Sequence, residues 1–340
     1  MRDLRVTVHI PIIYSARYRV DIGLHVFPTQ KYQLIVERLL EAGLVRPAEI
    51  VEPAPASWTD LALVHTAEYL EKIRGGTLTL GDQAQLELPW SIEMVEAFRS
   101  MVGGTILAAR FACGFPNAQH SSLNSQEGNS SKLRVESSKF HVAVHVGGGL
   151  HHAFPNHGEG FCPFNDVAVA VRVMQGLGVD RHAIVDLDVH HGNGTAFIFE
   201  SDPRAYTLSI HQQHNYPMWK PRGSRDVGLP DGVHDATYLR ELERVLPDVL
   251  AHRPDCIFYL AGADPFEDDQ LGGLRLTKDG LRRRDRMVIA AARDAHVPLV
   301  VVLAGGYARN VQDTVDMHCA TIREIVTLKS EVSTLRNPER

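Results

Sequence analysis

A nine-residue block from Asp186 to Gly194 constrains the fold of this chain more than any other stretch. It reads Asp-Leu-Asp-Val-His-His-Gly-Asn-Gly and directly follows the apolar run Ala183-Ile184-Val185. A short apolar run with β-branched residues, ended by glycine and asparagine, is typical of a buried parallel strand that ends in a loop. Because side chains alternate along a strand, we expect Asp186, Asp188 and His190 on one side of it. This spacing indicates a metal site.

The ligand types in this block indicate which metal ion would bind and whether the site is catalytic or structural. An imidazole nitrogen and carboxylate oxygens suit a borderline divalent ion such as zinc. Three protein ligands with a fourth position left open are typical of a catalytic rather than a structural zinc site. The alternative interpretation of Asp-x-Asp-x-His is a solvated loop edge without a metal, so the motif needs support from the rest of the chain.

The composition excludes other classes of protein. The chain has 340 residues, 44% of them hydrophobic and 22% charged, as in ordinary globular proteins. No change of composition divides it, so we expect one domain spanning residues 1–340. The net charge of −6 argues against direct binding of nucleic acid, which needs clustered basic residues. The one dense basic run, Arg282-Arg283-Arg284, is expected on the solvated face of an amphipathic helix.

The sequence also bears on location. No stretch approaches about 18 apolar residues, and the N-terminus lacks a charged and then apolar leader, so neither a membrane span nor a signal peptide is expected. The four cysteines contain no CxxC pair and are expected to be reduced thiols. The expected location is the cytoplasm.

Strand and helix patterns alternate in the second half of the chain. Strands are predicted at 140–146, 183–189, 205–210, 256–260 and 298–303, and helices at 166–175, 235–251, 278–295 and 309–328. This alternation predicts an α/β fold in a single domain, with a central parallel sheet and helices on both faces.

The first half of the chain is less regular. We expect a strand at 5–13, a helix at 29–42, and a long helix pattern at 91–112 that is interrupted at Gly103-Gly104. His65 lies between helix caps predicted at Ser57 and Thr66 and is expected to be structural rather than a ligand. The segment 114–138 is rich in Ser, Asn and Gln and is expected to be a surface insertion.

Chemically active residues follow four of the predicted strands. They are His151-His152, the Asp186–Gly194 block, Asp264 and Tyr307, each shortly after the end of a strand. In open α/β sheets, ligands bind outside the carboxyl ends of the strands. We therefore expect the active site at this edge of the sheet.

These residues supply the parts needed for metal-assisted hydrolysis. Asp188, His190 and Asp264 are predicted to hold the ion, and zinc lowers the pKa of a bound water to about 7. A histidine of the pair His151-His152 is expected to act as general base. Tyr307 is expected to donate a hydrogen bond to the developing oxyanion.

The two histidines need partners that orient their rings. Asp186 and Asn193 are the candidates, and because only one of them is charged, the two histidines are expected to titrate differently. Phe161 and Tyr216 are candidate walls of a narrow apolar channel, with core or rim packing as the alternative.

With these motifs the sequence resembles the zinc-dependent histone deacetylase family, within the arginase/deacetylase fold. Six segments carry the resemblance in the family's order: Gly-Gly-Gly-Leu-His-His-Ala at 147–153, Gly-Phe-Cys-Pro-Phe-Asn-Asp at 160–166, the Asp186–Gly194 block, Ala-Gly-Ala-Asp-Pro at 261–265, Leu-Gly-Gly-Leu at 271–274 and Gly-Gly-Tyr at 305–307. Further segments resemble the class IV branch, among them Pro-Ile-Ile-Tyr-Ser at 11–15 and Arg275 after the Leu-Gly-Gly-Leu.

The resemblance implies a role for each matching residue. His152 would be the general base, with His151 as its electrostatic partner, and Tyr307 would polarise the acyl carbonyl. Residues expected to flank the substrate are Gly160, Phe161, Tyr216 and Leu271. The family also implies a structural monovalent cation, usually potassium, near Asp186, Asp188, His190, Ser209 and Ile210.

Two features depart from the family pattern. Asn193 stands where class I members carry Asp, so the partner of His152 is neutral. The acidic residue that grips the substrate is not set by the motifs, because Asp82 and Glu87 both lie in the relevant region.

The predicted function is removal of acetyl or longer acyl groups from lysine side chains of proteins, with acylated lysine peptides or acylated amines as partners. Alternatives are a deacetylase of small molecules such as acetylpolyamines and a non-catalytic acyl-lysine binding module. A dinuclear manganese ureohydrolase shares the fold, but Gly192 and Gly262 occupy positions where further ligands would be expected. We therefore expect one catalytic metal per chain.

Overall fold

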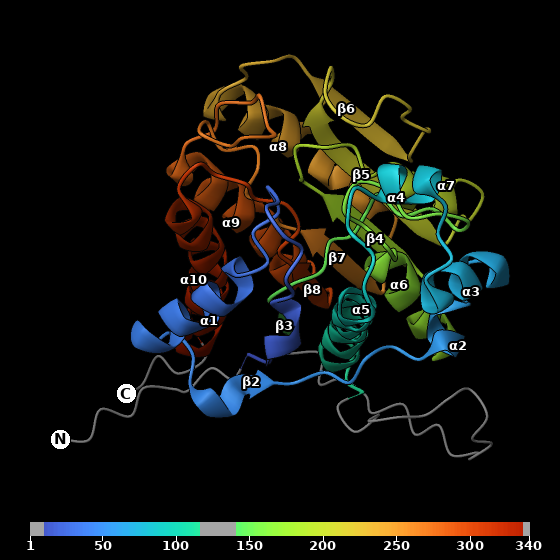
Figure 1. Cartoon of the computed structure of the whole chain (residues 1–340). Helices are drawn as coiled ribbons and strands as arrows, with labels where there is room; N and C mark the ends of the chain where they lie inside the picture. Colours follow the sequence, from blue (N-terminus) through green and yellow to red (C-terminus); the bar gives the residue numbers. More distant parts are fainter. Residues whose placement is uncertain (1–9, 116–140, 336–340) are drawn as a thin grey trace.

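The computed structural model describes residues 10–115 and 141–335, and at its centre lies an eight-stranded sheet (Figure 1). The strand order is β2-β1-β3-β8-β7-β4-β5-β6, and every pairing is parallel. The strands are β1 Ile12–Ile13, β2 Ile50–Val51, β3 Val142–His145, β4 His182–Asp186, β5 Ala205–Gln212, β6 Arg225–Leu229, β7 Cys256–Leu260 and β8 Leu299–Val302. The predicted parallel α/β fold is confirmed.

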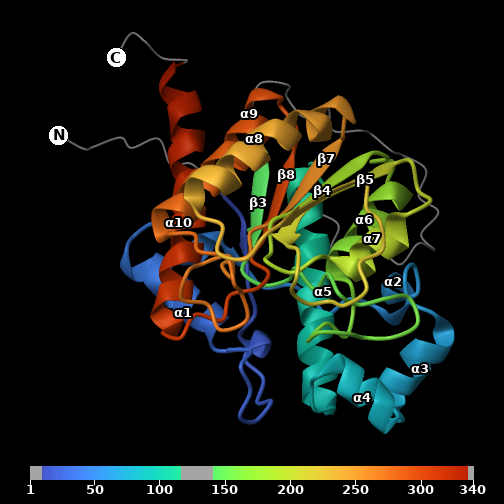
Figure 2. The same ribbon diagram turned by 90° about the horizontal axis from the view of Figure 1, so that it is seen from above.

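Helices cover both faces of the sheet, which gives three layers (Figure 2). One face carries a continuous row in which α8 packs on α9, α9 on α10, and α10 on α1. These helices are α1 Lys31–Glu41, α8 Asp235–Ala251, α9 Lys278–Asp294 and α10 Val311–Leu335. The other face is covered by α5 Ile92–Ala112, which packs against α6 Asp166–Gly176 and next to α7 Asn193–Phe199.

Short helices complete the fold outside these layers. They are η1 Ala16–Tyr18, η2 Pro47–Glu49, α2 Trp58–Leu61, α3 Ala67–Gly75 and α4 Leu80–Leu86. Ser57 and Thr66 cap α2 and α3 with their side-chain oxygens, as their sequence context predicts. None of the helices in the described residues combines the length and the apolar character that crossing a membrane requires.

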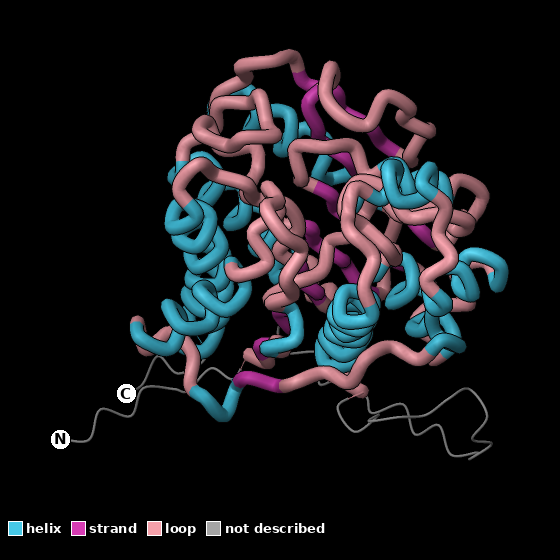
Figure 3. Tube along the Cα trace, in the orientation of Figure 1, coloured by secondary structure: helices cyan, strands magenta, loops and turns pink. Residues whose placement is uncertain are grey.

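The four central strands end in register. In the order β3, β8, β7 and β4, the last residues His145, Val302, Leu260 and Asp186 are paired across the sheet. All four strands are apolar runs that are buried on both faces, as expected for parallel strands covered by helices. The loops that leave their carboxyl ends therefore start side by side, and Figure 3 shows loops gathered in front of the strands in the middle of the molecule.

Several predicted boundaries differ from the structure. Strand β4 ends at Asp186 rather than at residue 189, because the backbone N–H groups of Asp188 and His190 donate to the side chains of Asp186 and Asp188 and not to a neighbouring strand. Strand β6 and helix α7 were not predicted. Of the strand predicted at 5–13, β1 covers only Ile12–Ile13 in the described residues, and positions 1–9 lie outside them. The insertion predicted at 114–138 lies almost wholly outside the described residues and stays a prediction.

The interruption predicted at Gly103-Gly104 was wrong, since α5 runs unbroken from Ile92 to Ala112. The two glycines permit close packing instead. A Cβ atom at Gly103 would lie 1.9 Å from the carbonyl oxygen of Ala54, and one at Gly104 would lie 2.3 Å from Nε2 of His145. Helix α5 therefore packs closer to Ala54 and His145 than it could with any other residue type at these two positions.

The basic run on α9 is only partly solvated, which corrects the expectation for Arg284. Arg283 is exposed, but Arg284 is 1% exposed and its guanidinium donates to the carbonyl oxygens of Leu187 and Gly262. These carbonyls belong to the loops after β4 and β7. The charge of Arg284 is paired with Asp285, at 2.7 Å. A buried arginine thus ties together two of the loops that form the candidate site.

Candidate active site

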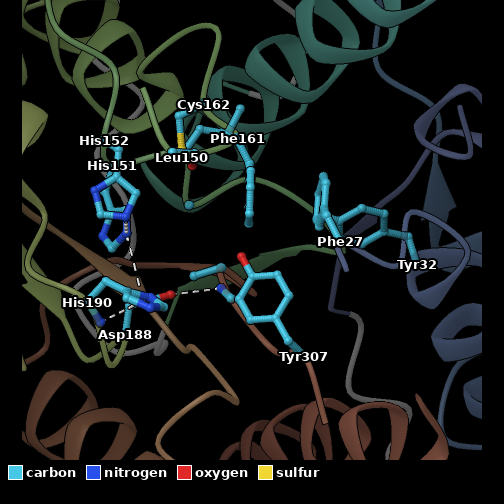
Figure 4. Close-up of a pocket in the computed structure, with 15 residues that line it drawn as sticks. Phe27, Tyr32, Leu150, His151, His152, Phe161, Cys162, Asp188, His190 and Tyr307 are labelled. Carbon is cyan, nitrogen blue, oxygen red and sulfur yellow. Dashed lines mark hydrogen bonds and ion pairs between the residues drawn. The ribbon is translucent and has the colours of Figure 1, made fainter. Parts of the chain in front are cut away.

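Asp188, His190 and Asp264 meet at the carboxyl edge of the sheet (Figure 4 shows Asp188 and His190). Asp188 and His190 lie in the loop after β4, and Asp264 lies in the loop after β7. One ligand atom from each residue lies within 4.8 Å of the others, and all three residues are buried. Within residues 10–115 and 141–335, this is the only group of His, Cys, Asp and Glu side chains that can hold a metal ion.

The three side chains are positioned by loop hydrogen bonds and not by strand alternation. The backbone N–H of His190 donates to Oδ1 of Asp188 at 3.0 Å, and that of Val189 donates to Oδ1 of Asp264 at 2.9 Å. Asp186, at the end of β4, turns its Oδ2 to Nδ1 of His151, 2.6 Å away. The prediction that Asp186, Asp188 and His190 emerge together from one strand was therefore wrong, because the strand ends at the first of them.

The chemistry of this pocket fits a divalent cation. Oδ2 of Asp264 is buried and has no hydrogen-bond partner among the described residues. Burial and the neighbouring Asp188 carboxylate raise the pKa of Asp264, and although burial opposes it, both carboxylates raise the pKa of His190 to about 10. A cation bound between the two buried carboxylates would compensate their negative charge. Nitrogen and oxygen donors in this number suit zinc.

Gly305 leaves room for an ion between the two carboxylates. Its backbone N–H donates to Oδ2 of Asp188 at 2.9 Å. A Cβ atom at this position would lie 2.0 Å from Oδ2 of Asp264 and 2.6 Å from Oδ2 of Asp188. Only glycine fits here.

His151 and His152 lie beside this group, with their ring centroids 4.1 Å apart and their ring planes tilted by 52° (Figure 4). Their Nε2 atoms are 3.1 Å apart, and Nδ1 of His152 lies 2.7 Å from Oδ1 of Asn193. Burial would lower the pKa of His151, but the Asp186 and Asp188 carboxylates raise it to about 9. Burial, followed by the charges of His151 and His190, lowers the pKa of His152 well below its ordinary value. The pair thus combines a charged and a neutral imidazole at neutral pH.

Tyr307 faces the metal-ligand group from the loop after β8 (Figure 4). Its ring contacts Phe161 edge-on, with the ring centroids 6.0 Å apart. Burial, with added repulsion from Asp188 and Asp264, raises the pKa of its hydroxyl well above the ordinary value. The hydroxyl therefore keeps its hydrogen and can donate it.

The residues expected to flank the substrate line one cavity. Gly160, Phe161, Tyr216 and Leu271 surround a space of about 150 Å³ that also touches His152, His190 and Tyr307. A smaller space of about 30 Å³ continues inward, past His151 and Asp188 to Phe27 and Tyr32. The predicted walls, base, ligands and tyrosine are therefore brought together around one channel.

The structure separates the two acidic candidates at the channel entrance. Glu87 lines the channel beside Tyr216 and Leu271, in a left-handed conformation with φ of 59°. Asp82 instead lies in the first turn of α4, where its Oδ2 accepts from the backbone N–H of the N-cap residue Thr79 at 2.8 Å, and it lines a different cavity.

Three of the five residues expected near a monovalent cation are adjacent in the sheet, and the other two, Asp188 and His190, lie in the loop after β4. Asp186 of β4 pairs with Ser209 of β5, and Ile210 follows on the same strand. Oγ of Ser209 lies 3.0 Å from Nδ1 of His211.

His65 is structural, as expected, since its ring nitrogens lie 3.0 Å from the carbonyl oxygen of Phe154 and 3.1 Å from the backbone N of Asn165.

Comparison with known proteins assigns the chain to a family. The family model described as "Histone deacetylase domain" matches residues 25–322. The chain belongs to the histone deacetylase family. It is 30% identical to Histone deacetylase 2 of Arabidopsis thaliana over 326 residues, which covers 90% of this chain and 78% of the plant protein. It is 40% identical to an uncharacterised protein of Picosynechococcus sp., with 91% of this chain and 95% of that protein covered.

Solved structures agree with the fold of the histone deacetylase family. The crystal structure of a histone deacetylase homologue from Aquifex aeolicus superposes with a TM-score of 0.74, at 22% identity, over 94% of this chain and 84% of that one. The histone deacetylase family is zinc-dependent, and the buried Asp188, His190 and Asp264 group of this member is a potential site for that metal.

Sequence reasoning missed polar residues behind the channel of this histone deacetylase family member. Lys31 of α1 is fully buried, and its Nζ donates to the carbonyl oxygen of Ala304 at 2.9 Å, with Nζ 5.5 Å from the ring centroid of Tyr307. Asp269 accepts the backbone N–H of Tyr307, and Glu159 accepts the amide of Asn193. Lys31 lies in an ordinary amphipathic helix pattern, and no motif marks the two acids, so no local signal distinguishes them.

Proposed function

We propose that the protein is a zinc-dependent amide hydrolase that removes acetyl groups from lysine side chains of proteins. The observation that carries the proposal is the meeting of three kinds of group at the inner end of one narrow channel. These groups are the buried ligand set of Asp188, His190 and Asp264, the histidine pair, and Tyr307. Zinc, when bound, supplies a Lewis acid and a source of nucleophilic water at neutral pH.

The two histidines would have different roles, with His152 transferring protons and His151 supplying a positive charge. The lowered pKa of His152 leaves a neutral imidazole, whose Nε2 can accept the proton of the attacking water and return it to the leaving lysine nitrogen. His151, held as an imidazolium by Asp186, would supply a fixed positive charge beside it. General acid–base catalysis of this kind contributes roughly 10²- to 10⁴-fold in rate.

Tyr307 would stabilise the charge that develops on the acyl oxygen. Its hydroxyl stays protonated and faces the ligand group. A donor already in place at this point costs no reorganisation during the reaction.

The channel suits a lysine stem that carries a short acyl group. Phe161 and Tyr216 would flank the methylene groups, with Gly160 and Leu271 at their sides. The inner space of about 30 Å³ holds only one or two water-sized groups. We therefore propose acetyl, rather than octanoyl or myristoyl, as the preferred acyl group, and Glu87 as the residue that grips the substrate at the entrance.

A small-molecule substrate is the second candidate, favoured by one observation. The exposed carboxylate of Glu87 at the entrance can accept hydrogen bonds from a peptide backbone, but it can equally attract the distal ammonium of an acetylated polyamine. A dinuclear ureohydrolase fits poorly, because a Cβ atom at Gly262 would lie 2.8 Å from Oδ1 of Asp264, where no second metal ligand can be placed. A binding module would have no use for the His151-His152 pair.

The finer expectations from the sequence are proposals as well. We propose a structural potassium ion near Asp186, Ser209 and Ile210, supported by the pairing of β4 with β5. We also propose membership of the class IV branch, supported by the Pro-Ile-Ile-Tyr-Ser segment at 11–15, and a cytoplasmic location.

Removal and return of the metal tests the proposal. We expect the purified protein to release acetate from acetyl-lysine peptides, to lose this activity on chelation, and to regain it with one zinc per chain. His190→Ala should abolish both zinc binding and activity. His296→Asn is the matched control, because His296 is exposed and precedes β8 at the opposite edge of the sheet. Full activity of the metal-free protein would contradict the proposal.

A further inference from the structure

Two buried side chains and one partly buried side chain form a series of hydrogen bonds that leads away from the active site. Nδ1 of His152 lies 2.7 Å from Oδ1 of Asn193, and Nδ2 of Asn193 donates to Oε1 of Glu159 at 2.6 Å. His152 is 5% exposed and Asn193 1% exposed, and the side chain of Glu159 is 13% exposed. Asn193 is therefore held between an imidazole and a carboxylate.

The donors and acceptors along this series can be arranged in only one way. An ionised carboxylate only accepts hydrogen bonds, so the amide of Asn193 must turn its NH₂ group to Glu159. Its oxygen then faces His152, and because that oxygen also only accepts, Nδ1 of His152 must carry the ring hydrogen. The lone pair of His152 is thereby left on Nε2, the atom that faces the channel.

Without Glu159 the amide loses the contact that fixes its NH₂ group, and only the 3.1 Å contact between Nε2 of His151 and Nε2 of His152 still favours the acceptor form of Nε2. Rotated by 180°, the amide would donate from Nδ2 to Nδ1 of His152, and the ring hydrogen would move to Nε2. A histidine in that tautomer cannot accept a proton from water at Nε2. An aspartate at position 193 would not have this ambiguity, since both of its oxygens accept.

Glu159 is itself held firmly by the surrounding chain. Its backbone N–H and C=O both bond to Cys162, at 3.2 and 2.9 Å. Its Oε2 accepts from Nε2 of Gln85 at 3.0 Å and lies 3.3 Å from Nε2 of His157. Burial alone would raise the pKa of Glu159, but these hydrogen bonds and that of Asn193 lower it. The carboxylate therefore stays ionised at neutral pH.

We propose that Glu159 is a positioning residue that fixes the amide of Asn193 and, through it, the ring orientation and tautomer of His152. The proposal rests on the proposed function, because it gives His152 the role of proton acceptor. It adds a residue outside the family motifs, and it makes the identities of positions 159 and 193 depend on each other.

Two substitutions at position 159 separate this role from a merely structural one. Glu159→Gln keeps an oxygen that can accept from Nδ2 of Asn193, so we expect kcat within about threefold of the wild type. Glu159→Met has a similar size but no acceptor, and we expect kcat to fall roughly 10- to 100-fold, as for other outer residues that orient a site, with KM within about twofold. A loss confined to KM, or an equal loss in both variants, would overturn the proposal.

Changes at position 193 test the dependence between the two residues. Asn193→Asp alone would place two carboxylates at the 2.6 Å contact, where one of them must take up a proton. The double variant Asn193→Asp with Glu159→Gln restores a donor and an acceptor at this contact. We expect the double variant to be at least tenfold more active than Asn193→Asp. If it is no more active, the two positions are independent and the proposal is wrong.

The tautomer of His152 can be observed without any turnover. ¹⁵N NMR of the full chain labelled at histidine, with the His152 signals identified by their loss in His152→Gln, reports which ring nitrogen carries the hydrogen. We expect the Nδ1–H form in the wild type and in Glu159→Gln, and a growing share of the Nε2–H form in Glu159→Met. An unchanged tautomer in folded Glu159→Met would overturn the proposal. If no substrate is turned over, the proposed function fails, but this spectrum still decides the role of Glu159. If Glu159→Met does not fold, the comparison at position 193 decides it.

Discussion

The backbone N–H of Tyr307 donates a 2.7 Å hydrogen bond to Oδ2 of Asp269. The other oxygen of this buried carboxylate, Oδ1, accepts from the backbone N–H groups of Leu271 and Gly272, at 2.8 and 3.0 Å. One side chain thus joins the turn that carries the tyrosine to the loop that lines the channel. The relative positions of Tyr307 and the channel wall depend on it.

Asp269→Asn should therefore impair catalysis. An amide in place of the carboxylate turns a donor toward at least one of the three N–H groups, and a buried unsatisfied donor costs about 1–3 kcal/mol. We expect kcat to fall roughly 10- to 100-fold, as for other supporting residues, while zinc still binds. Steady-state kinetics with metal analysis measures both. Asp268→Asn is the matched control, because Asp268 is exposed and pairs only with Arg309 in the described residues. Equal activity of the two variants would contradict this role.

Gly305→Ala should weaken metal binding. The added Cβ atom would lie 2.0 Å from Oδ2 of Asp264, so that carboxylate would have to move away from Asp188 and His190. We expect zinc affinity to fall by at least tenfold in a chelator competition assay, in line with displaced ligands elsewhere. Gly75→Ala, in α3, is the control, since its nearest neighbour would be 3.9 Å away. Unchanged affinity in Gly305→Ala would show that the ion lies elsewhere.

Buried Lys31 should make the free energy of unfolding depend on pH in the alkaline range. Burial lowers its pKa from 10.5 to about 8 in the folded protein. Below about pH 8 both states bind the proton, and the charged amine destabilises the fold. From about pH 8 to 10.5 the unfolded chain binds more protons, so stability rises with pH, by on the order of 3 kcal/mol in total.

Urea unfolding of the wild type and Lys31→Met measures this contribution. The free energy of unfolding of the wild type, relative to the variant, should increase between pH 8 and 10. Lys72→Met, which removes a partly exposed amine, is the control for loss of a lysine side chain. Parallel curves for the wild type and Lys31→Met would mean that Lys31 keeps its ordinary pKa in the fold.

Motifs and periodicity were sufficient to predict the parallel α/β fold class and the edge of the sheet at which the candidate site residues lie. The apolar runs of β3, β4, β7 and β8 mark buried parallel strands, and such strands place the residues after them at one edge. The candidate metal ligands, the histidine pair, Tyr307 and the residues that line the cavity meet there because the strand order β3-β8-β7-β4 makes the four loops neighbours. That order follows from packing across the whole chain and was not contained in any motif.

Single residues with long-range partners were not predictable in the same way. Arg284 continues a basic run on an amphipathic helix, and only the structure shows that it donates hydrogen bonds to the carbonyl oxygens of Leu187 and Gly262. Gly103 suggested a helix break by propensity, but the nearby carbonyl of Ala54 requires the small residue. In the sequence, Glu159 is an acidic residue in a glycine-rich turn with no motif around it, and only the structure shows its hydrogen bond with Asn193.

The central claim is tested most directly by one assay of the wild type and Tyr307→Phe with a matched set of substrates. The set comprises lysine peptides that carry acetyl, octanoyl or myristoyl groups, together with acetylated polyamines. We predict zinc-dependent turnover with a preference for the acetyl-lysine peptide, and a loss of about 10²- to 10³-fold in kcat in Tyr307→Phe with zinc still bound. Turnover of acetylated polyamines alone would show that the substrates are small molecules rather than proteins. Absence of turnover with every substrate, or full activity in Tyr307→Phe, would contradict the account.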